Sequence, residues 1–280
     1  MYRGFNLKIN VNDFDGKNSS EYKRLLKIGD AFNNNLNEKV DSVISKLTNE
    51  GIIDGTGLAD IWFKEIQSDV FISHSHNDEE LASVFSGWLK ETFGLKVFLD
   101  KNVWGSADKL IMAIDQIYCK KSNGQYDYDK RNFSTSHVHA MLTTALMKVM
   151  DQSEIVIFLN TSESIPTVKQ TMKEQSEYTL SPWIYVELVL TTLLKERHFS
   201  EYRKPILKFA HESAGIMKSL RVMYKAPTDV LTAINTSNLK DWYEEYKDSK
   251  ELKAVRYDGL VDANTDHPLN YLYSNVFGIE

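Results

Sequence analysis

The sequence predicts an α/β fold in which helices flank a mainly parallel β-sheet. From Ser68 onward, short apolar segments of strand length alternate with longer segments whose apolar residues recur every three or four positions. Polar residues also follow two of the expected strands directly, at His74 and Asp100. Because ligands of such sheets bind beyond the carboxyl ends of the strands, we expect both residues at the ligand-binding edge.

Residues 1–66 are predicted to form a helical extension before the main domain. Within 20–47, apolar residues recur at helical spacing, although the asparagine run at 33–35 leaves two shorter helices as an alternative. Three glycines between positions 51 and 57 then mark loops. The main domain is expected to span residues 67–280.

The main domain is predicted to alternate strands and helices along the chain. Gly94 fits the end of one helix, and Ser181 followed by Pro182 fits the start of another. The expected strands are 70–73, 95–99 and 154–159, and the expected helices are 78–93, 107–118, 141–150 and 181–194. The pattern weakens after His198, where we expect edge strands at 205–210 and 220–224 and helices at 238–246 and 268–277.

Composition excludes several classes of function. The formal charge of −6 provides no basic surface for a nucleic-acid backbone. Cys119 is the only cysteine, so no internal disulfide is formed, which suits the cytoplasm. The N-terminus lacks the apolar core of a signal peptide, and the longest apolar runs are too short to span a bilayer. We therefore expect a cytoplasmic protein that binds neither nucleic acid nor membrane.

Four segments stand in an order that suggests a known family. They read Asp-Val-Phe-Ile-Ser at 69–73, Val-Phe-Leu-Asp at 97–100, Ile-Val-Ile-Phe-Leu at 155–159 and Ser-x-Trp-x-x-x-Glu-Leu at 181–188. These segments resemble the first three strands and the catalytic helix of TIR (Toll/interleukin-1 receptor) domains. Asn-Val-Trp-Gly at 102–105 falls where that family has its BB loop, a flexible segment over the nucleotide pocket. The resemblance covers about residues 67–200 and implies a flavodoxin-like sheet.

The resemblance also implies an activity and a set of site residues. In the enzymatic branch of the family, a glutamate cleaves NAD, and here it would be Glu187. NAD would be the substrate, with no separate cofactor. The implied binding residues are Ser73, His74, Ser75, Asp100, Trp104 and Trp183. The product would be ADP-ribose or a cyclic isomer, made as a signal in a Thoeris-like antiphage system and sensed by a downstream effector.

The chain departs from a simple TIR domain in three places. Long inserts are expected near 104–139 and 161–180, and the C-terminal part is atypical. An enzyme lid and a partner-docking surface are both open interpretations of the inserts. We expect the segment from Trp104 to His139 to control activity through self-association of TIR domains, with a fixed structural flap as the alternative.

One carboxylate is sufficient for the implied chemistry. The nicotinamide of NAD is already cationic and leaves as a neutral base, so no general acid is needed, unlike in ordinary glycosidases. A carboxylate such as Glu187 stabilises the positive charge that develops on the ribose. Trp183 lies four residues earlier on the same helix face, where it either stacks on a base or packs in the core.

Other functions remain as alternatives or are rejected. The pairs His74-x-His76 and His137-x-His139 lack the spacing and cysteines of a metal site, so none is expected. No Gly-x-Ser-x-Gly, Rossmann or Walker pattern is present. The main alternative is a non-enzymatic TIR adaptor that acts by assembly, and a nucleoside-processing transferase is a third. For Glu187, Ser75 and Asp100, ordinary helix-capping or solvated roles are the competing interpretations.

Overall fold

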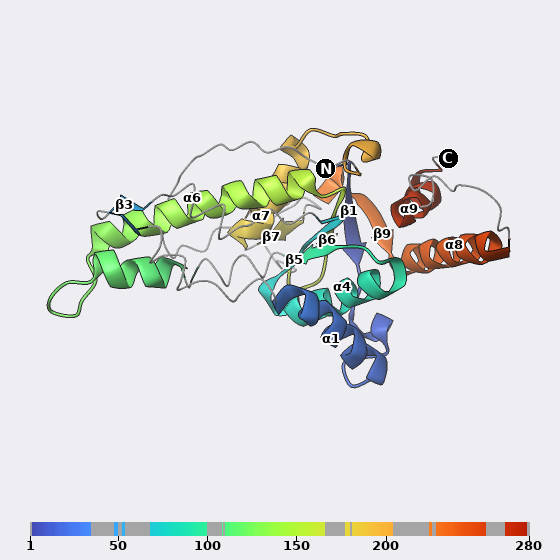
Figure 1. The fold of residues 1–280 in the computed structure, drawn as a ribbon, viewed down its shortest axis with the longest axis horizontal. Coiled ribbons are helices and arrows are strands. Elements are labelled where there is room, and N and C mark those ends of the chain that lie inside the picture. The colour runs from blue at the N-terminus through green and yellow to red at the C-terminus, as the bar shows by residue number, and fades with distance from the viewer. Residues whose placement is uncertain are drawn as a thin grey trace.

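The protein is built on a five-stranded sheet whose strands are all parallel (Figure 1). The computed structural model describes residues 2–34, 48–49, 52–53, 68–99, 108, 110–165, 177–179, 181–203, 224–225, 228–255 and 267–278. The sheet order is β5-β4-β6-β1-β9. The strands are β1 (Arg3–Lys8), β4 (Val70–Ser73), β5 (Val97–Leu99), β6 (Ile155–Leu159) and β9 (Thr232–Asn235). The predicted α/β, flavodoxin-like fold class is confirmed.

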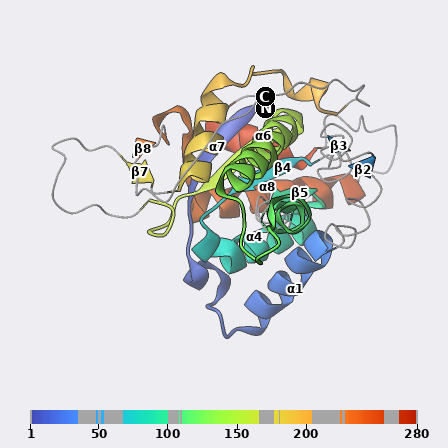
Figure 2. The same ribbon diagram turned by 90° about the vertical axis from the view of Figure 1, so that its left-hand side faces the viewer.

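Helices cover both faces of the sheet, as Figure 2 shows. One face carries α1 (Ser20–Asn34), α4 (Glu79–Phe93), α8 (Thr236–Val255) and α9 (Pro268–Phe277), and the other carries α6 (Tyr128–Gln152) and α7 (Pro182–Leu193). Two small antiparallel pairs, β2 (Thr48–Asn49) with β3 (Ile52–Ile53) and β7 (Tyr178–Thr179) with β8 (Tyr224–Lys225), lie outside the main sheet. Within the described ranges, no helix combines the length and apolar character that crossing a membrane requires.

The position of the first strand, β1, disagrees with the division into domains that the sequence predicts. β1 was expected in an extension, but it lies inside the sheet and pairs with both β6 and β9. Phe5 and Leu7 are fully buried in the main core, and α1 packs on α4 in the same core. The alternating polar residues of this strand hid the two apolar positions that face the core. Residues 3–34 therefore belong to the central fold.

Helix α6 is also longer than expected. The sequence predicts a helix at 141–150 after an inserted segment, whereas α6 begins at Tyr128 and runs without a break to Gln152. Asp127 caps its start, with the carboxylate accepting from the backbone N–H groups of Asp129 and Lys130. Its first half extends well past the sheet (Figure 1).

Several expected elements are confirmed. β4 spans the predicted residues, α4 ends at Gly94 with the left-handed φ of 70°, and α9 spans the predicted residues 268–277. The helix expected within 20–47 is present as α1, and helix α8 contains the expected 238–246. In the expected 107–118 helix, helical backbone at 110–114 continues into a π-helical turn, η3 (Asp115–Cys119). Residues 35–47 and the expected edge strand at 205–210 lie outside the described residues.

Helices α1 and α4 cross in direct backbone contact. Gly29 of α1 and Gly87 of α4 face each other, and a Cβ atom on Gly29 would lie 2.0 Å from the carbonyl oxygen of Ser83. A Cβ on Gly87 would lie equally close to the carbonyl oxygen of Leu25. The two glycines are therefore required by packing, since no larger residue fits between the helices.

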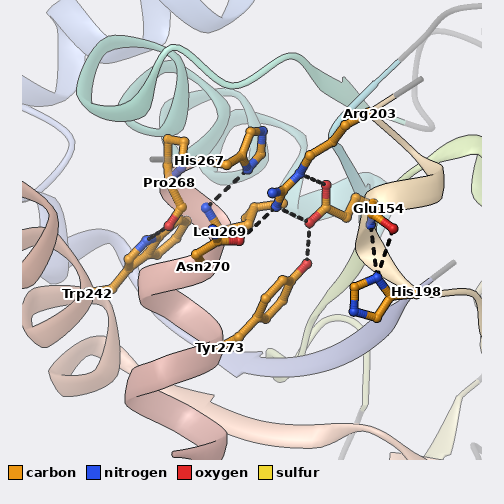
Figure 3. A network of polar contacts seen from close by, with 10 residues as sticks. Glu154, His198, Arg203, Trp242, His267, Pro268, Leu269, Asn270 and Tyr273 are labelled. Carbon is orange, nitrogen blue, oxygen red and sulfur yellow. Dashed lines mark hydrogen bonds and ion pairs between the residues drawn. The ribbon is translucent and has the colours of Figure 1, made fainter. Parts of the chain in front are cut away.

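A buried ion pair fastens the C-terminal helix to the amino edge of the sheet. Glu154 precedes β6 and bonds with the Arg203 guanidinium at 2.9 Å and the Tyr273 hydroxyl at 2.7 Å (Figure 3). Arg203 also donates to Asn270 of α9 at 2.9 Å. Burial raises the pKa of Glu154, and the Arg203 charge opposes that rise. This network lies at the opposite sheet edge from the candidate site.

Candidate functional site

A buried carboxylate lies at the carboxyl edge of the sheet. Glu187 is carried by α7 and is 1% exposed. Ser181 caps this helix by accepting from the Ile184 N–H at 3.3 Å, and Pro182 occupies its first turn, as predicted. Burying a carboxylate is unfavourable unless polar groups compensate it, so Glu187, the one charged residue of this helix, is exceptional.

The hydroxyl of Ser73 compensates part of that cost. Ser73 is the last residue of β4, and its Oγ donates to Glu187 Oε2 at 2.5 Å. The strands on either side of β4 are β5, the next sheet strand along the chain, and β6, which begins over eighty residues further on. This reversal of strand order is the topological switch point at which open α/β sheets bind ligands. The structure thus joins two predicted site residues that are 114 positions apart.

The residues that follow Ser73, in the loop after β4, differ in their burial and in their contacts. His74 is buried, with 4% exposure, whereas the side chain of His76 is 91% exposed. Ser75 caps the short helix η2 (His76–Asp78) by accepting from the Asn77 N–H. His74 is therefore buried at the end of β4 and Ser75 makes a capping bond, and a ligand-binding role for either residue stays a prediction. Among the described residues, no group of three or more His, Cys, Asp or Glu side chains is placed to hold a metal ion.

Sequence reasoning missed a second buried carboxylate beside His74. Asp78 is the N-cap residue of α4, but its side chain makes no cap bond to that helix. Its carboxylate instead accepts from the hydroxyls of Thr161 at 2.5 Å and Ser164 at 3.3 Å, in the loop after β6. Burial raises the pKa of Asp78, and these two hydroxyls oppose the rise. Asp78 thus clamps the loop after β4 to the loop after β6.

Trp183 packs between α7 and α6. Its ring meets the His139 ring edge-on, with centroids 5.2 Å apart, and Trp183 packs against the core that α6 buries. Burial lowers the pKa of His139, and the charge of Asp108 opposes that change. Trp183 lies one turn before Glu187, so a packing role and a stacking role for its partly buried ring both remain compatible with this position.

Two predicted site residues are not placed. Asp100 and Trp104 lie outside the described residues, so their proximity to Glu187 stays a prediction. The site that the structure defines therefore contains Glu187, Ser73, His74 and Asp78.

Comparisons with protein-family models, with curated proteins and with solved structures give no significant match to this chain. The contacts of the site place two carboxylates and an imidazole at the carboxyl edge of the sheet, where open α/β sheets in general bind their ligands.

Proposed function

We propose that this protein cleaves NAD between nicotinamide and ribose. The observation that carries the proposal is the almost fully buried Glu187, held by Ser73 at the switch point of the sheet. A carboxylate away from water interacts strongly with a developing positive charge, because solvent does not screen it. NAD cleavage develops such a charge on the ribosyl carbon.

The reaction balances with groups that the substrate, the solvent and Glu187 supply. The bond between the ribosyl carbon and the pyridinium nitrogen breaks, and nicotinamide leaves as a neutral base with the electron pair. Glu187 stabilises the ribosyl cation. Water then attacks the ribosyl carbon and loses a proton to solvent, which yields ADP-ribose. Attack by an adenine nitrogen yields a cyclic isomer instead.

The TIR resemblance supports the wider role that we propose. The product would act as a signal in the cytoplasm, in antiphage defence, and a downstream effector would sense it. The buried free thiol of Cys119 suits a reducing compartment.

The test compares Glu187→Gln with the wild-type protein. The substitution keeps size and polarity but removes the charge, so nicotinamide release, measured by chromatography, should fall about 10²–10³-fold. Glu196→Gln is the matched control, because the Glu196 side chain is 58% exposed and pairs with Arg3 away from the site. Full activity in a folded Glu187→Gln protein excludes the assignment.

A second candidate, a scaffold that acts by self-association, is favoured by one surface. Exposed apolar side chains occur in the helical segment 110–114, in η3 and in the first half of α6, where Met112, Ile117, Tyr128 and Phe133 are 57–69% exposed. Exposed apolar surface of this kind is typical of contact sites. A scaffold predicts concentration-dependent assembly, lost in Phe133→Ser, together with no nicotinamide release by the wild type.

A further inference from the structure

Asn6 lies in the same row of the sheet as Ser73. Strand register pairs Ser73 with Phe158, and Phe158 in turn with Asn6, across β4, β6 and β1. The neighbours of Asn6 in β1, Phe5 and Leu7, lie in the core on the α1 and α4 side. Because side chains alternate along a strand, Asn6 faces the α7 side, as Ser73 does.

The surroundings of Asn6 do not satisfy its amide oxygen. The residue is 9% exposed, and its Oδ1 is buried without a hydrogen-bond partner in the described part of the protein. Phe158 beside it belongs to an apolar cluster with Ile184 and Leu188 of α7. A buried amide without a partner destabilises the fold, and an apolar residue of similar shape would avoid that loss. The amide therefore calls for an explanation beyond stability.

The distance between Asn6 and Ser73, the hydrogen-bond partner of Glu187, suits one small ligand. Neighbouring strands lie about 4.8 Å apart, so the Cα atoms of Asn6 and Ser73 are separated by about 10 Å across β6. Asn6 is also the third residue from the end of β1, near the carboxyl edge of the sheet. A ligand that contacts both Glu187 and the row below α7 would therefore reach the Asn6 amide.

We propose that Asn6 binds the substrate in the Glu187 site and helps to set its specificity. An amide donates and accepts at once, so it pairs with a group that does the same, such as the carboxamide of nicotinamide. This inference rests on the proposed NAD-cleaving function. It assigns a role in ligand binding to the first strand of the chain, apart from its role in the fold.

The experiment measures thermal stability and ligand binding in the same variants. Asn6→Leu removes the unsatisfied amide oxygen, so the free protein should melt at the same or a higher temperature. Its Kd for NAD, measured by calorimetry in a Glu187→Gln background that prevents turnover, should rise about tenfold or more. Asn6→Ala serves as the second variant if leucine is too large for the site. Ser68→Ala is the matched control, because Ser68 is buried at the opposite sheet edge and bonds Ser153.

The outcomes separate this inference from the proposed function. Weaker NAD binding by both Asn6 variants, with Ser68→Ala unchanged, supports the role of Asn6. Binding equal to that of the parent protein overturns it, even if NAD is cleaved. NAD binding by the wild type without nicotinamide release overturns the proposed function alone. The absence of any NAD or nicotinamide binding by the wild type overturns both.

Discussion

Glu187 is a carboxylate that the protein holds out of solvent with a hydroxyl from a distant strand. Ser73 is also buried, with 1% exposure, so its bond to Glu187 Oε2 forms where water does not compete. A hydrogen bond to a charged group in such a place is stronger than one between neutral groups. The orientation of Glu187 therefore depends on Ser73.

Removing the Ser73 hydroxyl should impair the reaction without removing the charge. We expect Ser73→Ala to lower nicotinamide release about 10–100-fold, in line with about 1.5–3 kcal/mol for a hydrogen bond to a charged group. The measurement is kcat and KM at fixed pH, with the melting temperature recorded alongside. Ser86→Ala, a buried serine of α4 on the opposite face of the sheet, is the control. Equal kcat in both variants would contradict a catalytic dependence on Ser73.

At this scale, the sequence predicts residues that belong to local motifs and misses residues whose role depends on distant contacts. Ser73 and His74 lie at the end of a strand, and Glu187 lies in the second turn of a helix with a clear cap, which patterns reveal. Asp78 shows the opposite case, because only its contacts with Thr161 and Ser164 distinguish it from a helix cap. In the sequence, Asn6 is only one of several polar residues in a short segment, and nothing nearby distinguishes it.

Among the elements, α1 and α4 cross with their backbones in direct contact at Gly29 and Gly87. Gly29→Ala places a methyl group against a backbone carbonyl, which cannot rotate away as a side chain would. Overpacking of this kind costs about 1–3 kcal/mol or more, and it opposes the gain of about 1 kcal/mol that alanine brings to a helix. We expect a lower denaturation midpoint in urea. Lys27→Ala, an exposed position of the same helix, should leave it nearly unchanged, and matching losses would refute the packing argument.

The residue that caps α9 should make the stability of the folded protein depend on pH. Burial lowers the pKa of its capping residue, His267, to about 4, and the nearby Arg203 charge acts in the same direction. The unfolded residue keeps a pKa near 6.5, so the unfolded state binds more protons between these values. The stabilisation is complete above pH 6.5 and is lost as the pH falls toward 4.

The variant that isolates this effect is His267→Asn. Asparagine retains a side-chain acceptor for the helix cap but does not titrate in this range. The wild type should lose a few degrees more in Tm than the variant between pH 7 and pH 5, measured by calorimetry. Parallel Tm curves for the two proteins would show that His267 does not titrate in this way.

The elements that local patterns predict well are those with a cap, a glycine stop or an unbroken apolar run. β4, α7 and α9 have such signals, and α4 ends at its predicted glycine. The start of α6 was missed because its first turns project from the sheet and carry polar and aromatic residues. Their helical state depends on the Asp127 cap and on continuity with the buried second half.

For the molecule as a whole, the place of β1 determines which parts can be removed. β9 pairs only with β1 in the described sheet, so the loss of β1 leaves β9 without a sheet neighbour and exposes one edge of β6. The predicted division at residue 67 could not show this, because strand pairing between residues 5 and 157 leaves no local signal.

A protein lacking residues 1–9 should therefore fail to fold cooperatively. We expect the loss of near-ultraviolet circular dichroism and of a sharp thermal transition, since Phe5 and Leu7 supply fully buried core. Lys8→Ala, an exposed residue of the same strand, is the control and should melt as the wild type does. A truncated protein with a normal transition would mean that β1 is dispensable.

The central position of β1 also sets an order of events during protein synthesis. The ribosome makes this strand well before its partners, Ile155–Leu159 and Thr232–Asn235, which emerge only after many more residues have been added. Until those strands are made, Phe5 and Leu7 have no sheet to join, and they stay unpaired while translation proceeds at about 5–20 residues per second. The nascent chain therefore exposes the apolar residues of β1 until β6 and β9 have been made, and chaperones that bind such segments would bind it during that time.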